Sequence, residues 1–415
     1  MRILFLTNFY PPYELGGQGR SCQQVVQGLQ ARGHETLVLT SRHGVGETAV
    51  IEPDVHRSLF LEMELSPWRH ALVFFTSRKY RENHNHLLLK NVLQKFDPDV
   101  VFVWGMWNLD RSLAATAEAY CPRRVAYRFA EYWPTLPSQH KMYWEAPGRN
   151  IVARWLKQLL GRIAMRILER EEEPPQLAFA HVMCVSEATK NVLLDAGIAV
   201  NHAQVIHTGL DVSQYLNDQR DIKSGNDKQR LKLLYAGRLS PDKGVETAIQ
   251  AIAWLRHQHG LSNIHLGLAG AGAFEYEQHL RNLIAEAQLD DVVTLLGRIP
   301  PEEMPALYKQ YDVLIVPSIW PEPFARVVLE GMAASLVVVA TPSGGTAEIV
   351  HEGENGLLFA PGNAADLGEK IAKLTLDSEL GWRLAQNGHK TVQENFTVTR
   401  MLDGIEAFLK QAAKK

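Results

Sequence analysis

The chain has 415 residues, enough for two domains that each bury a sizeable hydrophobic core. Its 43 lysines and arginines and 46 aspartates and glutamates leave a net charge of −3, which excludes a general attraction to nucleic acid. The three cysteines, Cys22, Cys121 and Cys184, are far apart and odd in number, so they exclude a disulfide framework and are typical of a reducing compartment.

The N-terminal half predicts an open parallel sheet. A strand is expected at 2–7, a helix at 21–31 and a second strand at 35–40. Short apolar segments separated by helical stretches continue this pattern, at 99–104, 124–130, 181–185 and 203–207. Prolines interrupt the first apolar segment too early for a signal sequence, and no apolar run approaches the length of a membrane span, so we expect a cytoplasmic protein.

Three glycines, Gly16, Gly17 and Gly19, are expected in the loop between the first strand and the first helix. Glycines in such a loop let backbone amides approach a phosphate closely. Their spacing does not fit the dinucleotide fingerprint GxGxxG, and about eight residues separate them from the strand, so a nicotinamide or flavin site is not expected.

The composition changes after residue 212. The segment 213–230 is polar, which predicts a linker between a first domain at 1–212 and a second domain at 231–396. Apolar strands alternating with helices predict that the second domain is also doubly wound; the strands are expected at 231–237, 264–270, 292–297, 312–318 and 335–341. The last segment, 397–415, predicts an amphipathic helix that either caps this domain or crosses back to the first one.

The segment 317–359 is the most informative about function. Pro321 and Pro323 suit a loop and a first helical turn, which predicts a helix beginning near Phe324. The start of such a helix binds anions, and Glu330 is expected on roughly the same face as Glu322. A sugar nucleotide fits this arrangement, since its diphosphate takes the amides and its hydroxyls donate to the carboxylates. Acids near a helix start and a Gly-Gly pair are each more often structural, but together they favour a binding site.

This segment resembles the donor-binding signature of the retaining family 4 glycosyltransferases, also called group 1. The residues that match are Glu322, Glu330, Gly344, Gly345 and Glu348. The resemblance implies a GT-B fold of the α/β class, in which two doubly wound Rossmann-like domains face each other across a cleft and the last helix crosses back to the first domain. It also implies a set of donor-binding residues: Gly17, Gly19, Phe324, Ala325, Arg326, Glu330, Gly344 and Gly345. Ala325 stands where the family usually has glycine.

Two basic residues match positions that bind the diphosphate in the family that the chain resembles. A catalyst that breaks a sugar–phosphate bond must stabilise the negative charge that develops on the leaving diphosphate. Arg238 and Lys243 fit this need because they directly follow a predicted strand. Together with Glu322 they are the expected catalytic residues. With these cations present we expect no metal and no other cofactor, and the acidic Asp97–Asp99 segment is expected to be a turn that starts a strand.

The main departure from the family lies at the end of the strand at 124–130. Ala130 and Glu131 stand where the family commonly has His-Asp, and alanine cannot donate the hydrogen bond that the histidine gives to the donor sugar. Arg128 points to the same strand face as Ala130. Arg128 and Glu131 are therefore the acceptor-side candidates, and a structural arginine paired with an acid is the alternative for Arg128.

The segment 150–170 predicts a basic amphipathic helix. Its apolar residues recur at helical spacing and are flanked by arginines and a lysine; they are Val152, Trp155, Leu156, Leu159, Leu160, Ile163 and Ile167. Such a helix can lie on an anionic membrane. Packing on a sheet is the more common arrangement and is the interpretation that we favour.

These observations predict a metal-independent, retaining glycosyltransferase. It would move a sugar from a UDP- or GDP-sugar to a hydroxyl of a saccharide or a lipid-linked glycan, in the cytoplasm or at the inner face of a membrane. Retention follows from the resemblance alone. Two alternatives stay open. One is a non-catalytic sugar-nucleotide-binding protein, suggested by Ala130. The other is an epimerase or phosphorylase of the same architecture, which would need an acid/base pair or a cofactor lysine that we do not find beside 317–359.

Overall fold

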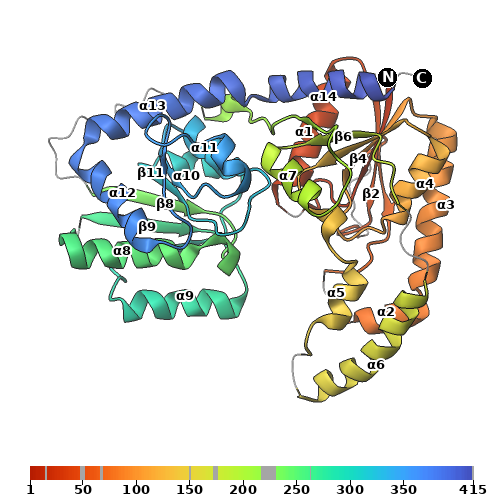
Figure 1. Ribbon diagram of the computed structural model, residues 1–415, viewed down its shortest axis with the longest axis horizontal. Coiled ribbons are helices and arrows are strands. Elements are labelled where there is room, and N and C mark those ends of the chain that lie inside the picture. Colours follow the sequence, from red (N-terminus) through yellow and green to blue (C-terminus); the bar gives the residue numbers. More distant parts are fainter. Residues whose placement is uncertain are drawn as a thin grey trace. The chain divides into compact units, whose positions relative to one another are not determined.

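The computed structural model describes residues 1–14, 16–46, 52–65, 69–148, 151–171, 176–215, 230–261 and 263–413. The chain divides into two compact units, whose elements are labelled in Figure 1. Unit 1 comprises Met1–Val185, Thr189–Ile206 and Leu402–Lys415, and unit 2 comprises Ser186–Ala188 and His207–Met401.

Unit 1 is built on a seven-stranded parallel sheet with the order β3-β2-β1-β4-β5-β6-β7. The strands are β1 (Arg2–Thr7), β2 (Glu35–Ser41), β3 (Val55–Leu59), β4 (Val100–Gly105), β5 (Val125–Phe129), β6 (His181–Cys184) and β7 (Gln204–Val205). The helices are α1 (Gly17–Ala31), α2 (His70–Thr76), α3 (Arg78–Phe96), α4 (Ser112–Tyr120), α5 (Gln139–Glu145), α6 (Ile151–Arg170) and α7 (Glu187–Asp195). Every residue of β4 and β5 is buried, as expected for a parallel sheet that is covered on both faces.

Unit 2 contains a six-stranded parallel sheet with the order β10-β9-β8-β11-β12-β13. The strands are β8 (Leu231–Ala236), β9 (Ile264–Ala269), β10 (Val293–Gly297), β11 (Val313–Val316), β12 (Val337–Ala340) and β13 (Leu357–Leu358). The helices are α8 (Val245–His259), α9 (Phe274–Glu286), α10 (Met304–Tyr308), α11 (Arg326–Ala333), α12 (Ala364–Leu376) and α13 (Ser378–Asn395), and the last helix, α14 (Val398–Ala412), begins in unit 2.

The first six strands of each sheet follow the same order, in which strands are added first on one side of the first strand and then on its other side. In unit 1 the resulting switch point lies between β1 and β4, and in unit 2 it lies between β8 and β11. Ligands of open α/β sheets bind outside the carboxyl ends of the strands at such a point. The prediction of two doubly wound, Rossmann-like domains is therefore confirmed, and each sheet has one defined place for a ligand.

The observed boundary between the units differs from the predicted one at residue 212. Unit 2 begins at His207 because the backbone around Leu210 pairs with the segment before α14, where the Leu210 N–H donates to the Phe396 carbonyl (2.8 Å). Most of the predicted linker, residues 216–229, lies outside the described residues. The last helix, α14, begins in unit 2 and belongs to unit 1 from Leu402 onward, where Glu406 forms an ion pair with Arg32 (2.8 Å).

Two helix starts differ from the predictions. Helix α1 begins at Gly17, so Gly17 and Gly19 lie in its first turn and not in a loop, and Gly16 is the residue that caps it with a positive φ of 73°. Helix α11 begins at Arg326, with Ala325 as its N-cap, so Pro323 precedes the first turn instead of belonging to it. Glu322 therefore lies in the loop before α11, and the expectation that it shares a helix face with Glu330 is wrong.

Helix α6 does not pack as expected. It lies against α5, and its own Ala164 forms a small cluster with Phe74 and Trp144, at the end of unit 1 where α2, α5 and α6 gather (Figure 1). Trp155, Leu156, Leu159 and Ile163 of the predicted stripe are exposed, and Leu160 and Ile167 are partly buried against this cluster instead of on the sheet. None of the helices in the described ranges is long and apolar enough to cross a membrane.

Candidate donor site in unit 2 and polar cluster in unit 1

The loops that follow three neighbouring strands carry the predicted catalytic residues and one pair of the predicted donor-binding glycines. Arg238 and Lys243 follow β8, Glu322 follows β11, and the Gly344–Gly345 pair follows β12. These strands are adjacent in the sheet, in the order β8-β11-β12, and β8 and β11 flank the switch point. The fold thus brings residues about 100 positions apart in the sequence to the sheet edge where a ligand is expected.

Lys243 and Glu322 form the central contact of this region. The Lys243 ammonium lies 2.5 Å from Glu322 Oε1, and both side chains are mostly buried, with 24% and 14% exposed. The Ser318 hydroxyl donates to the same carboxylate oxygen (2.7 Å). Sequence reasoning had not identified Ser318, although its position two residues after β11 is a place where ligand-facing side chains are common.

A close backbone contact fixes the loop that carries Glu322. The Gly345 N–H donates to the Glu322 carbonyl (2.7 Å), and Gly344 has a φ of 56°. A Cβ atom at Gly344 would lie 2.2 Å from the Glu322 carbonyl oxygen. Glycine is therefore required by the approach of two backbones, and the Gly345 amide is already occupied by a protein carbonyl.

Helix α11 offers fewer free amides than predicted. The Arg326 N–H donates to the Phe324 carbonyl and the Val328 N–H to the Ala325 carbonyl, both at 2.9 Å. The Phe324 ring stacks on His207, with ring centroids 5.4 Å apart, and packs near Phe396. Positive charge in this region therefore comes mainly from side chains.

Glu330 has its own set of partners. The Tyr308 hydroxyl donates to Glu330 Oε2 (2.9 Å), and Arg326 Nε lies 3.2 Å from Oε1. The Arg326 Nη1 atom is buried without a hydrogen-bond partner in the structure. Burial raises the pKa of Tyr308, and the nearby Glu330 carboxylate raises it further, so the phenol stays a hydrogen-bond donor.

Arg238 is the most exposed of the predicted catalytic residues, with 67% of its side chain accessible. It forms an ion pair with Asp242 (3.3 Å), whose main-chain carbonyl also accepts the Ile319 and Trp320 N–H groups. Burial raises the pKa of Asp242, but the Ser240 hydroxyl and the charges of Arg238 and Lys243 outweigh it and hold the pKa below its ordinary value. Asp242 thus links the loops after β8 and β11.

Glu348, which matched the family signature, has a supporting position. Its carboxylate accepts the Glu187 and Ala188 N–H groups (3.0 and 2.8 Å) and lies 3.1 Å from His207 Nε2. Burial raises its pKa, but the His207 hydrogen bond and the two backbone N–H groups lower it below its ordinary value. Glu348 therefore holds the segment 186–188 and His207 to the body of unit 2.

The acceptor-side candidates lie in unit 1, at the carboxyl end of β5. Arg128 is only 2% exposed, and its guanidinium stacks over the Trp104 ring at 4.1 Å. Burial raises the pKa of Glu131 to about 7, although the Trp107 backbone and the Arg128 charge lower it, and its Oε1 atom is buried without a hydrogen-bond partner. Of the two candidates, Glu131 has the carboxylate oxygen that a bound hydroxyl could satisfy, whereas the burial of Arg128 favours the structural alternative.

The start of α1 lies at the carboxyl end of β1, next to the switch point of unit 1. Gly19 is buried there, and a Cβ atom on it would lie 2.7 Å from Glu14 Cβ. The side-chain amide of Gln18 donates to the Ala130 carbonyl (3.1 Å), so this turn contacts the segment that carries Glu131. The structure thus brings Gly17, Gly19 and Glu131 to one edge of the sheet.

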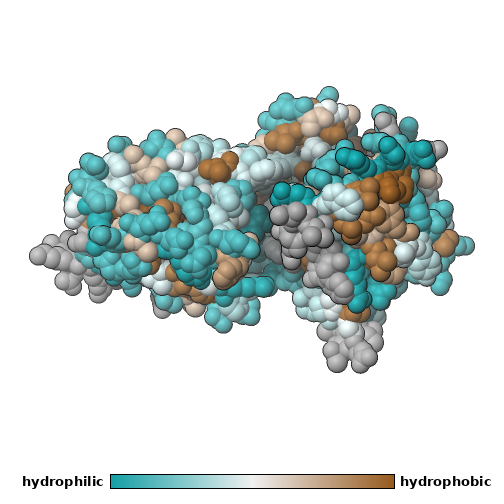
Figure 2. All heavy atoms as spheres, turned by 90° about the horizontal axis from the view of Figure 1, so that it is seen from below, coloured by the Kyte–Doolittle hydropathy of each residue, from teal (hydrophilic) through white to brown (hydrophobic). Residues whose placement is uncertain are grey.

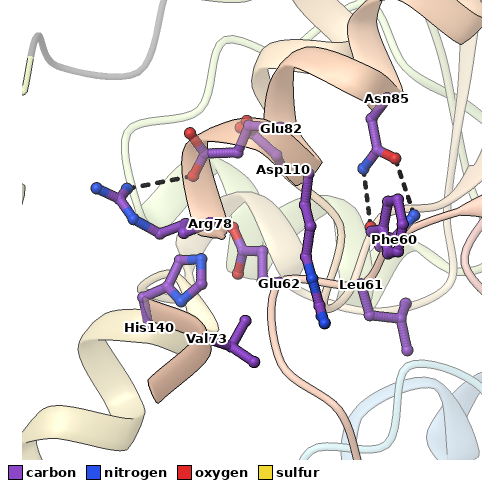
Figure 3. A pocket seen from close by; sticks show the side chains of 10 residues that line it. Phe60, Leu61, Glu62, Val73, Arg78, Glu82, Asn85, Asp110 and His140 are labelled. Carbon is purple, nitrogen blue, oxygen red and sulfur yellow. Dashed lines mark hydrogen bonds and ion pairs between the residues drawn. The ribbon is translucent and has the colours of Figure 1, made fainter. Parts of the chain in front are cut away.

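A separate cavity in unit 1 is lined by Glu62, Arg78, Asn85 and His140 (Figure 3). Its volume of about 20 Å³ is room for about one water molecule, too little for a sugar nucleotide. Burial raises the pKa of Glu62 to about 7, and the Gln139 N–H bond to its carboxylate lowers it. None of the predicted site residues lines this cavity. In the part of the chain that the structure describes, no three His, Cys, Asp or Glu residues are grouped to hold a metal ion.

Two family models match the chain. The model described as Glycosyltransferase Family 4 matches residues 15–214, and the model described as Glycosyl transferases group 1 matches residues 217–391. Together they extend over nearly the whole sequence. The chain therefore belongs to the family 4, group 1 glycosyltransferases.

Individual relatives agree with this assignment. An uncharacterized glycosyltransferase of Methanocaldococcus jannaschii is 33% identical over 224 residues, which cover 54% of this chain and 57% of the relative. A glycogen synthase of Mycobacterium tuberculosis is 25% identical over 417 residues, with 95% of this chain and 91% of the relative covered. The matches span 57%, 47% and 36% of the first three curated relatives, about half of their length.

The fold class is confirmed by solved structures. The structure of Anabaena HepE in complex with UDP has a TM-score of 0.70 at 22% identity, with 99% of this chain and 100% of HepE covered. The prediction of a GT-B protein with two Rossmann-like domains is therefore correct.

Proposed function

We propose that this protein is a metal-independent, retaining glycosyltransferase that uses a UDP- or GDP-sugar. Its acceptor would be a hydroxyl group of a saccharide or of a lipid-linked glycan. The observation that carries this proposal is the Lys243–Glu322 contact at the switch point of unit 2, where a cation and a carboxylate lie 2.5 Å apart. A sugar nucleotide contains a group that matches each of them.

In the proposed mechanism, Lys243 and Arg238 stabilise the leaving diphosphate. The bond between the anomeric carbon and the phosphate oxygen breaks, and the acceptor oxygen forms a bond to the same carbon on the same face. The acceptor proton passes to the leaving phosphate oxygen, so no side-chain base is needed. A hydrogen-bonding side chain held in place near the charge that develops in the transition state typically lowers the activation free energy by about 2.7–4 kcal/mol.

The carboxylates of unit 2 would bind hydroxyl groups. Glu330, which is held by Tyr308 and Arg326, is proposed to accept from the ribose, and Glu322 to accept from the sugar. In unit 1, the unpartnered oxygen of Glu131 is proposed to accept a hydrogen bond from an acceptor hydroxyl. The names of relatives support a donor of this class: HepE was solved with UDP and with UDP-glucose, and glycogen synthase is a relative over most of the chain.

The first experiment is a thermal-shift screen of nucleoside diphosphates and their sugars, followed by transfer assays with the donors that bind. Lys243→Ala should lower turnover by about 100- to 1,000-fold while the fold stays intact. The matched control is Lys390→Ala, because Lys390 is an exposed lysine of the same unit with only a loose ion pair to Glu394 (3.9 Å).

Three results would contradict the proposal. Near-normal turnover by folded Lys243→Ala would remove that residue from the mechanism. Donor binding by the wild type without transfer or slow hydrolysis would identify a non-catalytic binding protein. Inversion of the anomeric configuration in the product, measured by NMR, would exclude retention.

A further inference from the structure

Helix α6 has two faces of different character. At 100° of rotation per residue, Trp155, Leu156, Leu159 and Ile163 fall within about 100° of the helix circumference. We call these four residues the outer apolar face. Between 47% and 65% of each of them is exposed, so this face has no partner among the described residues of unit 1.

The opposite face of α6 accounts for its place in the fold. Gly161 and Ala164 are buried there, and Leu160 and Leu168 pack against the cluster of Phe74 and Trp144. At the end of the helix Glu171 pairs with Arg78, and that hydrogen bond lowers the pKa of Glu171 although burial raises it. The helix is therefore anchored on its inner side, and the outer apolar face does not contribute to this packing.

Arginines surround the outer apolar face. Arg162, Arg166 and Arg170 are exposed and project from the same side of the helix, and Arg154 is exposed beside its first turn. Among the described side chains of this helix, Glu169 is the only acidic one, and it is exposed. Large apolar side chains alternating with cations in this way match the acyl chains and head groups of an anionic lipid surface.

The apolar surface continues onto the neighbouring helices. Phe75 of α2 is 41% exposed, and its ring lies 5.7 Å from that of Trp144 on α5, which contacts α6 at Gly161. Figure 2, which views the molecule from the side where α2, α5 and α6 lie, shows hydrophobic side chains gathered on unit 1 next to hydrophilic ones.

We infer that α6 is an interfacial helix, whose outer apolar face enters the surface of an anionic bilayer while its arginines contact the phosphate head groups. The helix cannot cross the bilayer, since no described helix is apolar enough to do so. A protein that bound this face would have to neutralise the four arginines around the apolar residues. An anionic bilayer offers acyl chains to the apolar residues and phosphate groups to the arginines at the same time.

The test is sedimentation of the full chain with vesicles of phosphatidylcholine and phosphatidylglycerol, and with vesicles of phosphatidylcholine alone. No donor or acceptor is added, so the result does not depend on the proposed glycosyl transfer. The wild type should bind the anionic vesicles and lose binding at high salt. Arg162→Gln with Arg166→Gln should weaken the partition coefficient by on the order of 20-fold. Trp155→Ser with Leu159→Ser should weaken it by more than about tenfold.

The matched control is Phe274→Ser with Leu376→Ser, since these residues are 75% and 86% exposed in unit 2. This variant should bind vesicles like the wild type, and circular dichroism checks that all variants fold. The proposal is overturned if the wild type does not sediment or binds both vesicle types equally, or if either α6 variant binds as well as the wild type. It is also overturned if the wild type is dimeric without vesicles and the Trp155/Leu159 variant is monomeric, because the face is then a contact between two copies.

Discussion

Replacing Gly344 by alanine tests whether the backbone contact between the loops after β11 and β12 holds Glu322 in place. The substituted Cβ atom would lie 2.2 Å from the Glu322 carbonyl oxygen and 2.7 Å from its nitrogen, so the Glu322 backbone must move. The residue also has a φ of 56°, which costs an L-residue about 1–2 kcal/mol. Forcing the loops apart adds about 1–3 kcal/mol.

Gly353 provides the matched control. Its φ is 71°, but no heavy atom lies within 4 Å of the position where its Cβ would stand. Gly353→Ala therefore carries only the cost of the backbone conformation, about 1–2 kcal/mol. Gly344→Ala should lower the free energy of unfolding by about 1–3 kcal/mol more than the control, and it should also weaken binding of the donor, which the control should not.

The assay is urea unfolding followed by circular dichroism, combined with calorimetric titration of whichever sugar nucleotide the wild type binds. A loss of donor affinity in Gly344→Ala at conditions where the protein is fully folded would separate the local displacement from global destabilisation. If the two variants are equally stable and both bind the donor like the wild type, the contact does not position Glu322 and the reasoning fails.

Two further predictions concern the metal and the pH dependence. Excess EDTA should leave sugar transfer unchanged, because we propose that Lys243 and Arg238 supply the positive charge; a loss of activity that magnesium or manganese restores would contradict this. Burial holds the pKa of Glu131 near 7, above its ordinary 4.5, so the stability due to its protonated form is present below about pH 4.5 and is lost as the pH rises to about 7. The free energy of unfolding of Glu131→Gln relative to that of the wild type, measured with urea, should therefore increase by on the order of 2–3 kcal/mol between about pH 4.5 and pH 8. An equal difference at both pH values would contradict the pKa shift.

Most strands were predictable because they are short apolar runs with sharp ends. The observed β8, Leu231–Ala236, differs by one residue from the prediction, and the central strands of unit 1 agree as closely. Two strands gave no such signal. β3 reads VHRSL and lies at the sheet edge, where only its two end residues are buried, and β13 has only two residues. Edge and very short strands are defined by pairing with a neighbour, which a local pattern does not contain.

Helix starts and side-chain partners were less predictable. The first turn of α1 contains Gly17 and Gly19, which have no apolar periodicity, so its start could not be read from the pattern. The contacts of Ser318 with Glu322 and of Tyr308 with Glu330 depend on how loops and helices meet in space. The apolar stripe of α6 was visible in the sequence, but periodicity does not tell whether a stripe faces a sheet or the solvent.

The charges of unit 2 explain why the proposed ligand should contain both phosphate and hydroxyl groups. Each cation near the switch point already has a carboxylate: Arg238 pairs with Asp242, Lys243 with Glu322 and Arg326 with Glu330. Inorganic phosphate that captured Lys243 would leave the mostly buried Glu322 without its cation, which is costly. In the proposed complex a sugar nucleotide replaces both partners at once, because its diphosphate binds the cation while its hydroxyls donate to the carboxylate. We therefore expect the intact donor to bind more tightly than its diphosphate alone, since only the donor offers a sugar to Glu322.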